Sequence, residues 1–254
     1  MIVPTPASAS ASPPLPVPLP PWLVIVALVV ASAAIAPFEY DHANAWMRAT
    51  HGVLSDHRDL LTIGEQYPST WGIIFIGALM FLLDHTRRDR TFRYLLGLLT
   101  VGLLNGVLKI VFNRLRPPFD RRNDYVPETE WFKYQDWNWF CYVQHGTRTL
   151  GDADYWSYPS GHTCAAVFTA MTLTRFYPRG WPVWWFLALT TMAQRFTSAS
   201  HYPADLLAGT AVGLLFYRLV VTWPPLMRAE DSSSTTLARW LGGRCQPLKD
   251  DASS

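Results

Sequence analysis

Three short clusters of polar residues stand at the edges of apolar stretches and contain the groups needed to handle a phosphate. A cationic side chain at the edge of a membrane-spanning stretch costs free energy unless it binds an anionic group. Arginine offers a planar fork to two phosphate oxygens and lysine a mobile point charge, while histidine can transfer a proton near neutral pH. The clusters therefore predict a site that cleaves a phosphate ester without a metal ion. Their members are Lys109, Arg116 and Pro117; Pro159, Ser160, Gly161 and His162; and Arg195, His201 and Asp205.

The spacing inside the first and third clusters favours side chains that meet. Lys109 and Arg116 would be two turns apart on one helix, so both could project toward the same point. The alternative is an interfacial pair that reaches for lipid headgroups. His201 and Asp205 would be one helical turn apart, so the carboxylate could hold one imidazole nitrogen and leave the other free to act. Here the alternative is an ordinary surface ion pair.

The second cluster lies where a loop is expected to enter a helix. Ser160 is a typical N-cap residue, and Gly161 allows a ligand to approach the backbone closely. The first N–H groups of the helix and its positive dipole end together form an anion site. A protonated His162 is disfavoured at this end unless a dianion is bound beside it. The alternative is a plain helix cap with a bystander histidine.

The composition indicates a membrane protein. The chain is 50% hydrophobic and 16% charged, whereas about 25% of residues are charged in typical soluble domains. Six apolar stretches predict an all-α polytopic bundle of about six transmembrane helices, although several are shorter than the ~20 residues that span a bilayer. A soluble all-α protein with buried helices is the alternative. The stretches are Trp22–Ala36, Trp71–Leu83, Tyr94–Phe112, Thr163–Phe176, Trp181–Met192 and Leu206–Trp223.

Charge and cysteine content give little sign of a nucleic-acid-binding, metal-binding or disulfide-rich protein. The formal net charge of +2 is too small to suggest a nucleic-acid partner. The 3 cysteines have neither metal-ligand spacing nor the pattern of a disulfide framework. The sequence favours no particular oligomeric state.

The chain divides into three parts. Residues 1–21, rich in proline and alanine, predict a disordered leader. Residues 22–223 predict the membrane-embedded domain, and residues 224–254 a mobile cytoplasmic tail. The stretch 22–36 could instead be a cleaved signal peptide, because it ends in small residues. The leader lacks the basic residues that precede a signal sequence, so we expect a retained helix.

Basic residues predict the orientation of the bundle. The segment 84–93 is rich in arginine, which favours the cytoplasmic side. Alternation of the helices then places all three clusters on the opposite, non-cytoplasmic face. Basic residues in the outer loops go against this rule, and phosphate binding would explain only Arg116 and Arg195. The outer segment 113–158 is aromatic, so we expect it either to lie on the lipid headgroups or to form a cap packed on itself.

Together, the clusters resemble the three-part signature of the type 2 phosphatidic acid phosphatase (PAP2) family. This family includes membrane lipid phosphatases and shares its site with soluble acid phosphatases and vanadium haloperoxidases. One departure is Gln194, where the family usually has serine; because glutamine also donates hydrogen bonds, we expect altered tuning rather than loss of the site. The resemblance covers about residues 71–223. The matching motifs are Lys109-x6-Arg116-Pro117, Pro159-Ser160-Gly161-His162 and Arg195-x5-His201-x3-Asp205.

The resemblance implies a role for each of these residues. His201 would be the nucleophile that forms a phosphohistidine, and Asp205 would fix its tautomer. His162 would be the general acid and then the base that activates water. No cofactor or metal is implied, because fixed cations would supply the charge that Mg²⁺ provides elsewhere. The residues implied to bind the substrate phosphate are Lys109, Arg116, Ser160, Gly161 and Arg195.

The expected function is hydrolysis of a lipid phosphate, such as phosphatidic acid or a prenyl pyrophosphate, on the outer face of the cell membrane. Two alternatives remain open at this point. One is a membrane sugar-phosphate phosphatase. The other is a catalytically silent protein that binds or transports lipid. The set of His162, His201 and Asp205 argues against the silent protein, since a pure binder needs cations but no proton-transfer groups.

Overall fold

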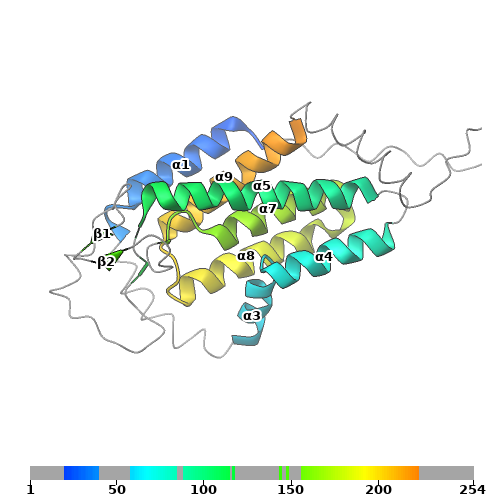
Figure 1. The fold of residues 1–254 in the computed structure, drawn as a ribbon, viewed down its shortest axis with the longest axis horizontal. Helices are drawn as coiled ribbons and strands as arrows, with labels where there is room; N and C mark the ends of the chain where they lie inside the picture. Colours follow the sequence, from blue (N-terminus) through cyan, green and yellow to red (C-terminus); the bar gives the residue numbers. More distant parts are fainter. Residues whose placement is uncertain are drawn as a thin grey trace, which may run out of the picture.

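The computed structural model describes residues 20–39, 58–84, 88–114, 116–117, 143–144, 147–148 and 156–222 (Figure 1). In these residues the all-α prediction is confirmed, because a two-residue antiparallel ladder is the only extended structure among them. The predicted leader up to residue 19, the tail 224–254 and most of the aromatic segment 113–158 lie outside them. The elements are α1 (Trp22–Ile35), α3 (Arg58–Gln66), α4 (Thr70–Leu83), α5 (Arg88–Phe112), β1 (Val143–Gln144), β2 (Thr147–Arg148), α7 (Gly161–Phe176), the 3₁₀ turn η2 (Pro178–Gly180), α8 (Trp181–Thr197) and α9 (Pro203–Thr222).

Each of the six predicted apolar stretches forms one helix, and α5 and α8 extend furthest beyond their stretch. Helix α5 begins at Arg88 rather than Tyr94. Its polar first turns are supported by an ion pair one turn apart, with Arg93 NH2 3.8 Å from Asp89 Oδ2. Helix α8 continues past Met192 to Thr197, because the polar residues of its last turns find partners on α3.

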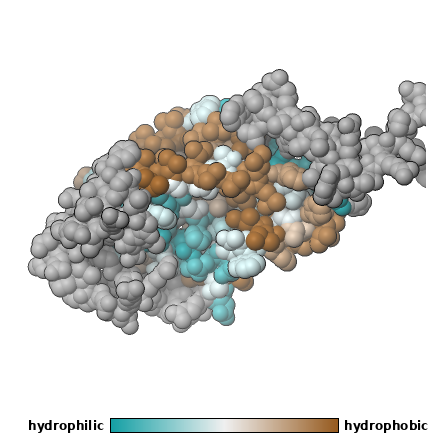
Figure 2. All heavy atoms as spheres, viewed as in Figure 1, coloured by the Kyte–Doolittle hydropathy of each residue, from teal (hydrophilic) through white to brown (hydrophobic). Residues whose placement is uncertain are grey.

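Two of the described helices, α5 and α9, are long and apolar enough to cross a membrane, and the pair α3–α4, bent by 68°, would be a third span. Six transmembrane helices therefore stay a prediction. Large apolar side chains lie exposed on α4 and α5; Leu82 is 69% exposed and Leu103 65% exposed. Apolar residues also cover much of the described surface in Figure 2. Such a surface is compatible with a membrane protein.

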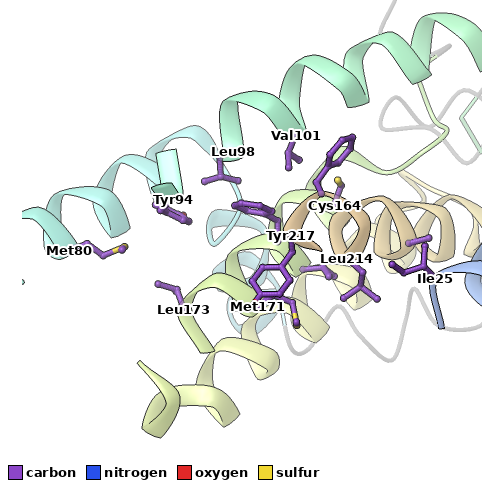
Figure 3. Packing of buried hydrophobic residues seen from close by; sticks show 14 residues of the cluster. Ile25, Met80, Tyr94, Leu98, Val101, Cys164, Met171, Leu173, Leu214 and Tyr217 are labelled. Carbon is purple, nitrogen blue, oxygen red and sulfur yellow. The ribbon is translucent and has the colours of Figure 1, made fainter. Parts of the chain in front are cut away.

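Helix α7 lies at the centre of the bundle and packs against α5, α8 and α9 (Figure 1). Its residues are buried almost continuously from Thr163 to Leu173. The apolar core forms where α7 faces α5 and α9 (Figure 3). Contributing side chains include Tyr94, Leu98 and Val101 of α5, Phe168 and Met171 of α7, and Leu214 and Tyr217 of α9.

Glycines set the distance between α9 and α7. A Cβ atom on Gly209 would lie 2.6 Å from the carbonyl oxygen of Ser160, and one on Gly213 would lie 2.7 Å from the carbonyl oxygen of Cys164. Both distances are too short for a real contact, so the backbones of the two helices approach in a way that only glycine permits. This contact holds the start of α9 beside the start of α7, where the second and third clusters lie.

We expect Gly209→Ala to destabilise the protein by about 1–3 kcal/mol, because its methyl group would push α9 away from α7. The matched control is Gly102→Ala on α5, where no atom lies within 4 Å of the added carbon. This control should be neutral or stabilising by up to ~1 kcal/mol, since alanine is the better helix former. Thermal unfolding of the purified proteins in detergent measures both. Equal melting temperatures would contradict the close approach.

Candidate functional site

Three loops meet at the end of the bundle where α5 ends and α7 begins (Figure 1). One loop follows α5, the second precedes α7, and the third joins α8 to α9. Backbone hydrogen bonds connect them: Ser157 N donates to the carbonyl oxygen of Arg114 at 3.0 Å, and Ser160 N donates to that of Asp205 at 3.0 Å. Because each loop carries one of the predicted clusters, these bonds bring the three clusters together.

The carboxylate of Asp205 is the centre of a buried hydrogen-bond network. Its Oδ2 accepts from the hydroxyl of Ser157 and, at 2.9 Å, from Tyr202 N. The same oxygen lies 3.4 Å from His201 Nδ1. Its Oδ1 accepts from NH1 of Arg114 at 2.7 Å. Since Asp205 is 0% exposed, these donors replace the water that a carboxylate would otherwise bind.

The predicted pair of His201 and Asp205 forms, but not on one helix. Helix α9 begins at Pro203, so His201 lies in the preceding loop and the predicted helical spacing is wrong. A residue with positive φ, Ala199 at 50°, turns the chain. The N–H group of His201 then donates to the carbonyl oxygen of Arg195 at 3.2 Å. The loop therefore presents the imidazole to the first turn of α9.

Burial keeps the imidazole of His201 neutral. Burial lowers the pKa of His201 to about 4, while the hydrogen bond and the charge of Asp205 act in the opposite direction. The imidazole is therefore uncharged at pH 7. With its Nδ1 hydrogen directed to Asp205, the lone pair of Nε2 is the one available for chemistry.

Lys109 and Arg116 also reach the site by a route other than the predicted one. Helix α5 ends before Arg116, where Asn113 adopts a positive φ of 41°, so the prediction of two turns on one helix is wrong. Lys109 Nζ donates to the carbonyl oxygen of Trp156 at 2.9 Å. Arg116 NH1 donates to that of Ser200 at 3.3 Å. Each cation is thus tied to a loop that carries another cluster.

The start of α7 matches the predicted helix cap. Ser160 is the N-cap residue, and its Oγ accepts from Thr163 N at 3.4 Å. A Cβ atom on Gly161 would lie 3.8 Å from Lys109 Nζ and 3.0 Å from Asn105 Nδ2. The N-terminus of α7 therefore faces the lysine of the first cluster. This arrangement combines helix N–H groups and a cation at one point, which suits an anion.

His162 occupies the first turn of α7 and is surrounded by charge. It lies within electrostatic reach of four other ionisable residues of the predicted site. These are Lys109, Arg116, Arg195 and His201. An anion bound among these groups would favour the imidazolium form of His162. The position suits a group that exchanges a proton with a bound phosphate ester.

Arg195 is held by a residue that the sequence analysis missed. Its guanidinium, in the last turns of α8 and 3% exposed, pairs with Oε1 of Glu65 from α3. Gln194 Nε2 donates to Oε2 of the same carboxylate at 3.1 Å. The side chain that departs from the family motif therefore fixes the carboxylate that orients Arg195. Glu65 lies outside the three clusters, and nothing in its own segment marked it.

Three further polar residues were missed: Arg114, Glu39 and Ser157. Arg114 connects the carboxylates of Asp205 and Glu39, with an N–O distance of 2.7 Å to each. A signal for Arg114 did exist, because it is a basic residue in a predicted outer loop and stands between two motif cations. Ser157 and Glu39 carried no such signal. Among the described residues, no group of three or more His, Cys, Asp or Glu is placed to hold a metal ion.

We expect Gln194→Met to weaken the binding of inorganic phosphate about fivefold, because loss of one hydrogen bond, worth about 1 kcal/mol, loosens Glu65 and with it Arg195. Isothermal titration calorimetry of the detergent-purified protein measures this change. The matched control is Gln66→Met, at an exposed position of α3, which should leave the phosphate affinity unchanged. Equal affinities of the two variants would show that Gln194 does not support Arg195.

Comparison with known proteins gives one match. The family model of the PAP2 superfamily matches residues 90–228, which is more than half of the 254-residue chain. The matched range contains all three clusters, whereas α1, α3 and α4 lie outside it. A search of curated proteins and a search of solved structures each found no match. The family predicted from the three motifs is confirmed, and the chain belongs to the PAP2 superfamily.

Proposed function

We propose that the protein hydrolyses a lipid phosphate at the non-cytoplasmic face of the membrane, through a phosphohistidine and without a metal ion. Membership of the PAP2 superfamily, whose members are generally phosphatases, supports the reaction class. The observation that carries the mechanism is the buried pair of His201 and Asp205, with Nδ1 3.4 Å from Oδ2. A carboxylate that holds one ring nitrogen orients the other for attack on phosphorus.

The reaction proceeds in two steps. In the first, Nε2 of His201 forms a bond to phosphorus while the bond to the leaving oxygen breaks, and His162 donates its proton to that oxygen. In the second, His162 accepts a proton from water, whose oxygen attacks phosphorus and breaks the P–N bond. Inorganic phosphate leaves, and His201 returns to its neutral form.

The phosphate oxygens are bound by cations and by the start of α7. Lys109, Arg116 and Arg195 supply three positive charges, which stabilise the charge of the transition state. The hydroxyl of Ser160 and the N–H of Gly161 contribute at the helix N-terminus. The closeness of Gly161 to Lys109, with 3.8 Å between the Cβ position and Nζ, supports this grouping.

A lipid substrate is favoured by where the site lies on the helices. Helix α5 has 25 residues and is therefore about 37 Å long, enough to cross a hydrocarbon core of about 30 Å. The site lies at its C-terminal end, whereas Arg88, Arg90 and Arg93 lie in its first turns. A lipid in the bilayer would present its phosphate at this level, beside the exposed leucines of α5. The location of the site and of these arginines at opposite ends of α5 also supports the proposed orientation.

We expect His201→Ala to reduce phosphate release by at least ~1,000-fold, as other enzymes lose activity with their nucleophile. The assay uses detergent-solubilised protein and a panel of lipid monophosphates, lipid pyrophosphates and a sugar phosphate. His57→Ala, outside the three clusters, is the control and should keep full activity. Normal turnover by His201→Ala would refute the nucleophile. Preference for the sugar phosphate would refute the proposal of a lipid substrate. If the unmodified protein released no phosphate from any substrate, the proposed enzymatic activity would be refuted.

We expect phosphate release to continue unchanged after dialysis against EDTA, because protein cations neutralise the charge of the transferred phosphoryl group. The rate of release before and after dialysis, with and without added Mg²⁺, checks this expectation. A metal-dependent phosphatase dialysed in parallel shows that the chelator works. A rate that is lost in EDTA and restored by Mg²⁺ would contradict the mechanism.

A further inference from the structure

A second buried carboxylate, Glu39, adjoins the network around Asp205 from outside the matched part of the chain. It lies just beyond the C-terminal end of α1 and is 6% exposed. Its Oε1 accepts from Arg114 NH2 at 2.7 Å, and its Oε2 accepts from Ala204 N at 2.7 Å. Ala204 belongs to the first turn of α9, which also carries Asp205. Glu39 therefore reaches Asp205 by two routes, through Arg114 and through the helix start.

Arg114 shares one positive charge between two carboxylates. NH1 bonds Asp205 and NH2 bonds Glu39, while the guanidinium carbon lies 4.4 Å from the ring centroid of Tyr202. Burial acts to lower the pKa of Arg114, but the charges of Asp205 and Glu39 outweigh it and raise that pKa above its ordinary value. Arg114 thus stays charged. Without Glu39, Arg114 would pair with Asp205 alone. Its positive charge would then weaken the electrostatic attraction between that carboxylate and the imidazole of His201.

Packing determines the place of Glu39, because α1 is fixed to α9 at both ends. Near the site, the hydroxyl of Ser32 donates to the carbonyl oxygen of Ala204 at 2.8 Å and bonds the hydroxyl of Tyr158 at 3.1 Å. At the far end, Arg218 NH1 donates to the carbonyl oxygen of Pro20 at 2.8 Å. Helix α1 lies along α9 between these points (Figure 1). An element bonded at both ends is part of the bundle.

We propose that Glu39 is a positioning residue of the phosphatase site: through Arg114 and the first turn of α9, it fixes the geometry of Asp205 and directs the charge of that carboxylate to His201. The inference rests on the proposed phosphatase activity and adds a requirement to it. Helix α1 is then a retained part of the working enzyme, not a cleaved signal peptide. The site extends beyond the range matched by the family.

The expected signature is a loss of turnover without a loss of substrate affinity. Glu39 bonds the groups behind Asp205, whereas the substrate phosphate meets Lys109, Arg116 and Arg195. Glu39→Gln should therefore lower kcat about 10- to 100-fold, as expected for a charged hydrogen bond lost to the network, and leave KM nearly unchanged. A purely structural defect would instead reduce the amount of folded protein and leave the turnover of the folded fraction intact.

The test measures kcat and KM of Glu39→Gln in detergent, with Asp84→Asn as the matched control. Asp84 pairs with Arg90 at 3.0 Å at the other end of the bundle, so the control also breaks an ion pair but should keep full kcat. Glu39→Asp should recover part of the lost kcat. In an Asp205→Asn background, Glu39→Gln should have little additional effect, because both changes act on the same group.

Four outcomes would overturn the inference. Full kcat in Glu39→Gln, or an equal loss of kcat in Asp84→Asn, would remove the positioning role while the phosphatase stands. The positioning role would also be removed if the losses of kcat from Glu39→Gln and Asp205→Asn were independent in the double variant. If Glu39→Gln fails to fold, Arg114→Lys provides the test, because lysine keeps the charge but lacks the fork that reaches both carboxylates. Full kcat in Arg114→Lys would also contradict the positioning role. Failure of the unmodified protein to release phosphate would overturn the proposed function itself.

Discussion

The buried negative charge of Asp205 is the constraint on which the site depends. Transferring a carboxylate out of water costs several kcal/mol unless hydrogen bonds and opposite charge replace the solvent. The donors come from three places: Arg114 after α5, Ser157 before α7, and Tyr202 N at the start of α9. Each of these segments adjoins one of the motif clusters. Satisfying one carboxylate therefore assembles the clusters from three distant parts of the chain.

The close packing of α7 and α9 makes this assembly possible. Glycines on α9 bring its backbone within contact of α7, so the loops before the two helices can share hydrogen bonds such as Ser160 N to the carbonyl oxygen of Asp205, at 3.0 Å. The apolar core then lies along the helices (Figure 3), and the charged groups bonded to Asp205 lie at the end where α7 and α9 begin. This separation lets buried charges find partners without interrupting the apolar contacts that stabilise the bundle.

The six apolar helices could be predicted from the sequence, because a long apolar stretch buries its surface most readily as a helix. Helix α3 was missed, because its segment, Arg58–Gln66, is mostly polar and was assigned to an outer loop. The helical spacing of Lys109 with Arg116, and of His201 with Asp205, was wrong because Asn113 and Pro203 mark the helix ends. The side chains meet nevertheless, since the loops fold back over the helix ends.

Tertiary partners were harder to predict. Glu39 is 75 positions from Arg114, and Glu65 is 130 positions from Arg195. No local pattern encodes a contact of that range. Arg114 could have been singled out, because a basic residue between two motif cations already went against the charge rule for outer loops.

The presence of Glu39 and Glu65 near the proposed phosphate site needs a physical reason, since each carboxylate repels phosphate. Each is bonded to a guanidinium, whose five N–H donors are not exhausted by one carboxylate. Each carboxylate weakens the attraction for phosphate but holds its arginine in one orientation. An arginine already held in place loses less conformational freedom on binding. The side chain of Glu39 is 4% exposed and that of Glu65 37% exposed. Solvent therefore screens the charge of Glu65 more strongly, so Arg195 keeps more of its positive potential for a ligand than Arg114 does. This difference suits Arg114 to the support of Asp205 and Arg195, like Arg116, to the proposed binding of phosphate.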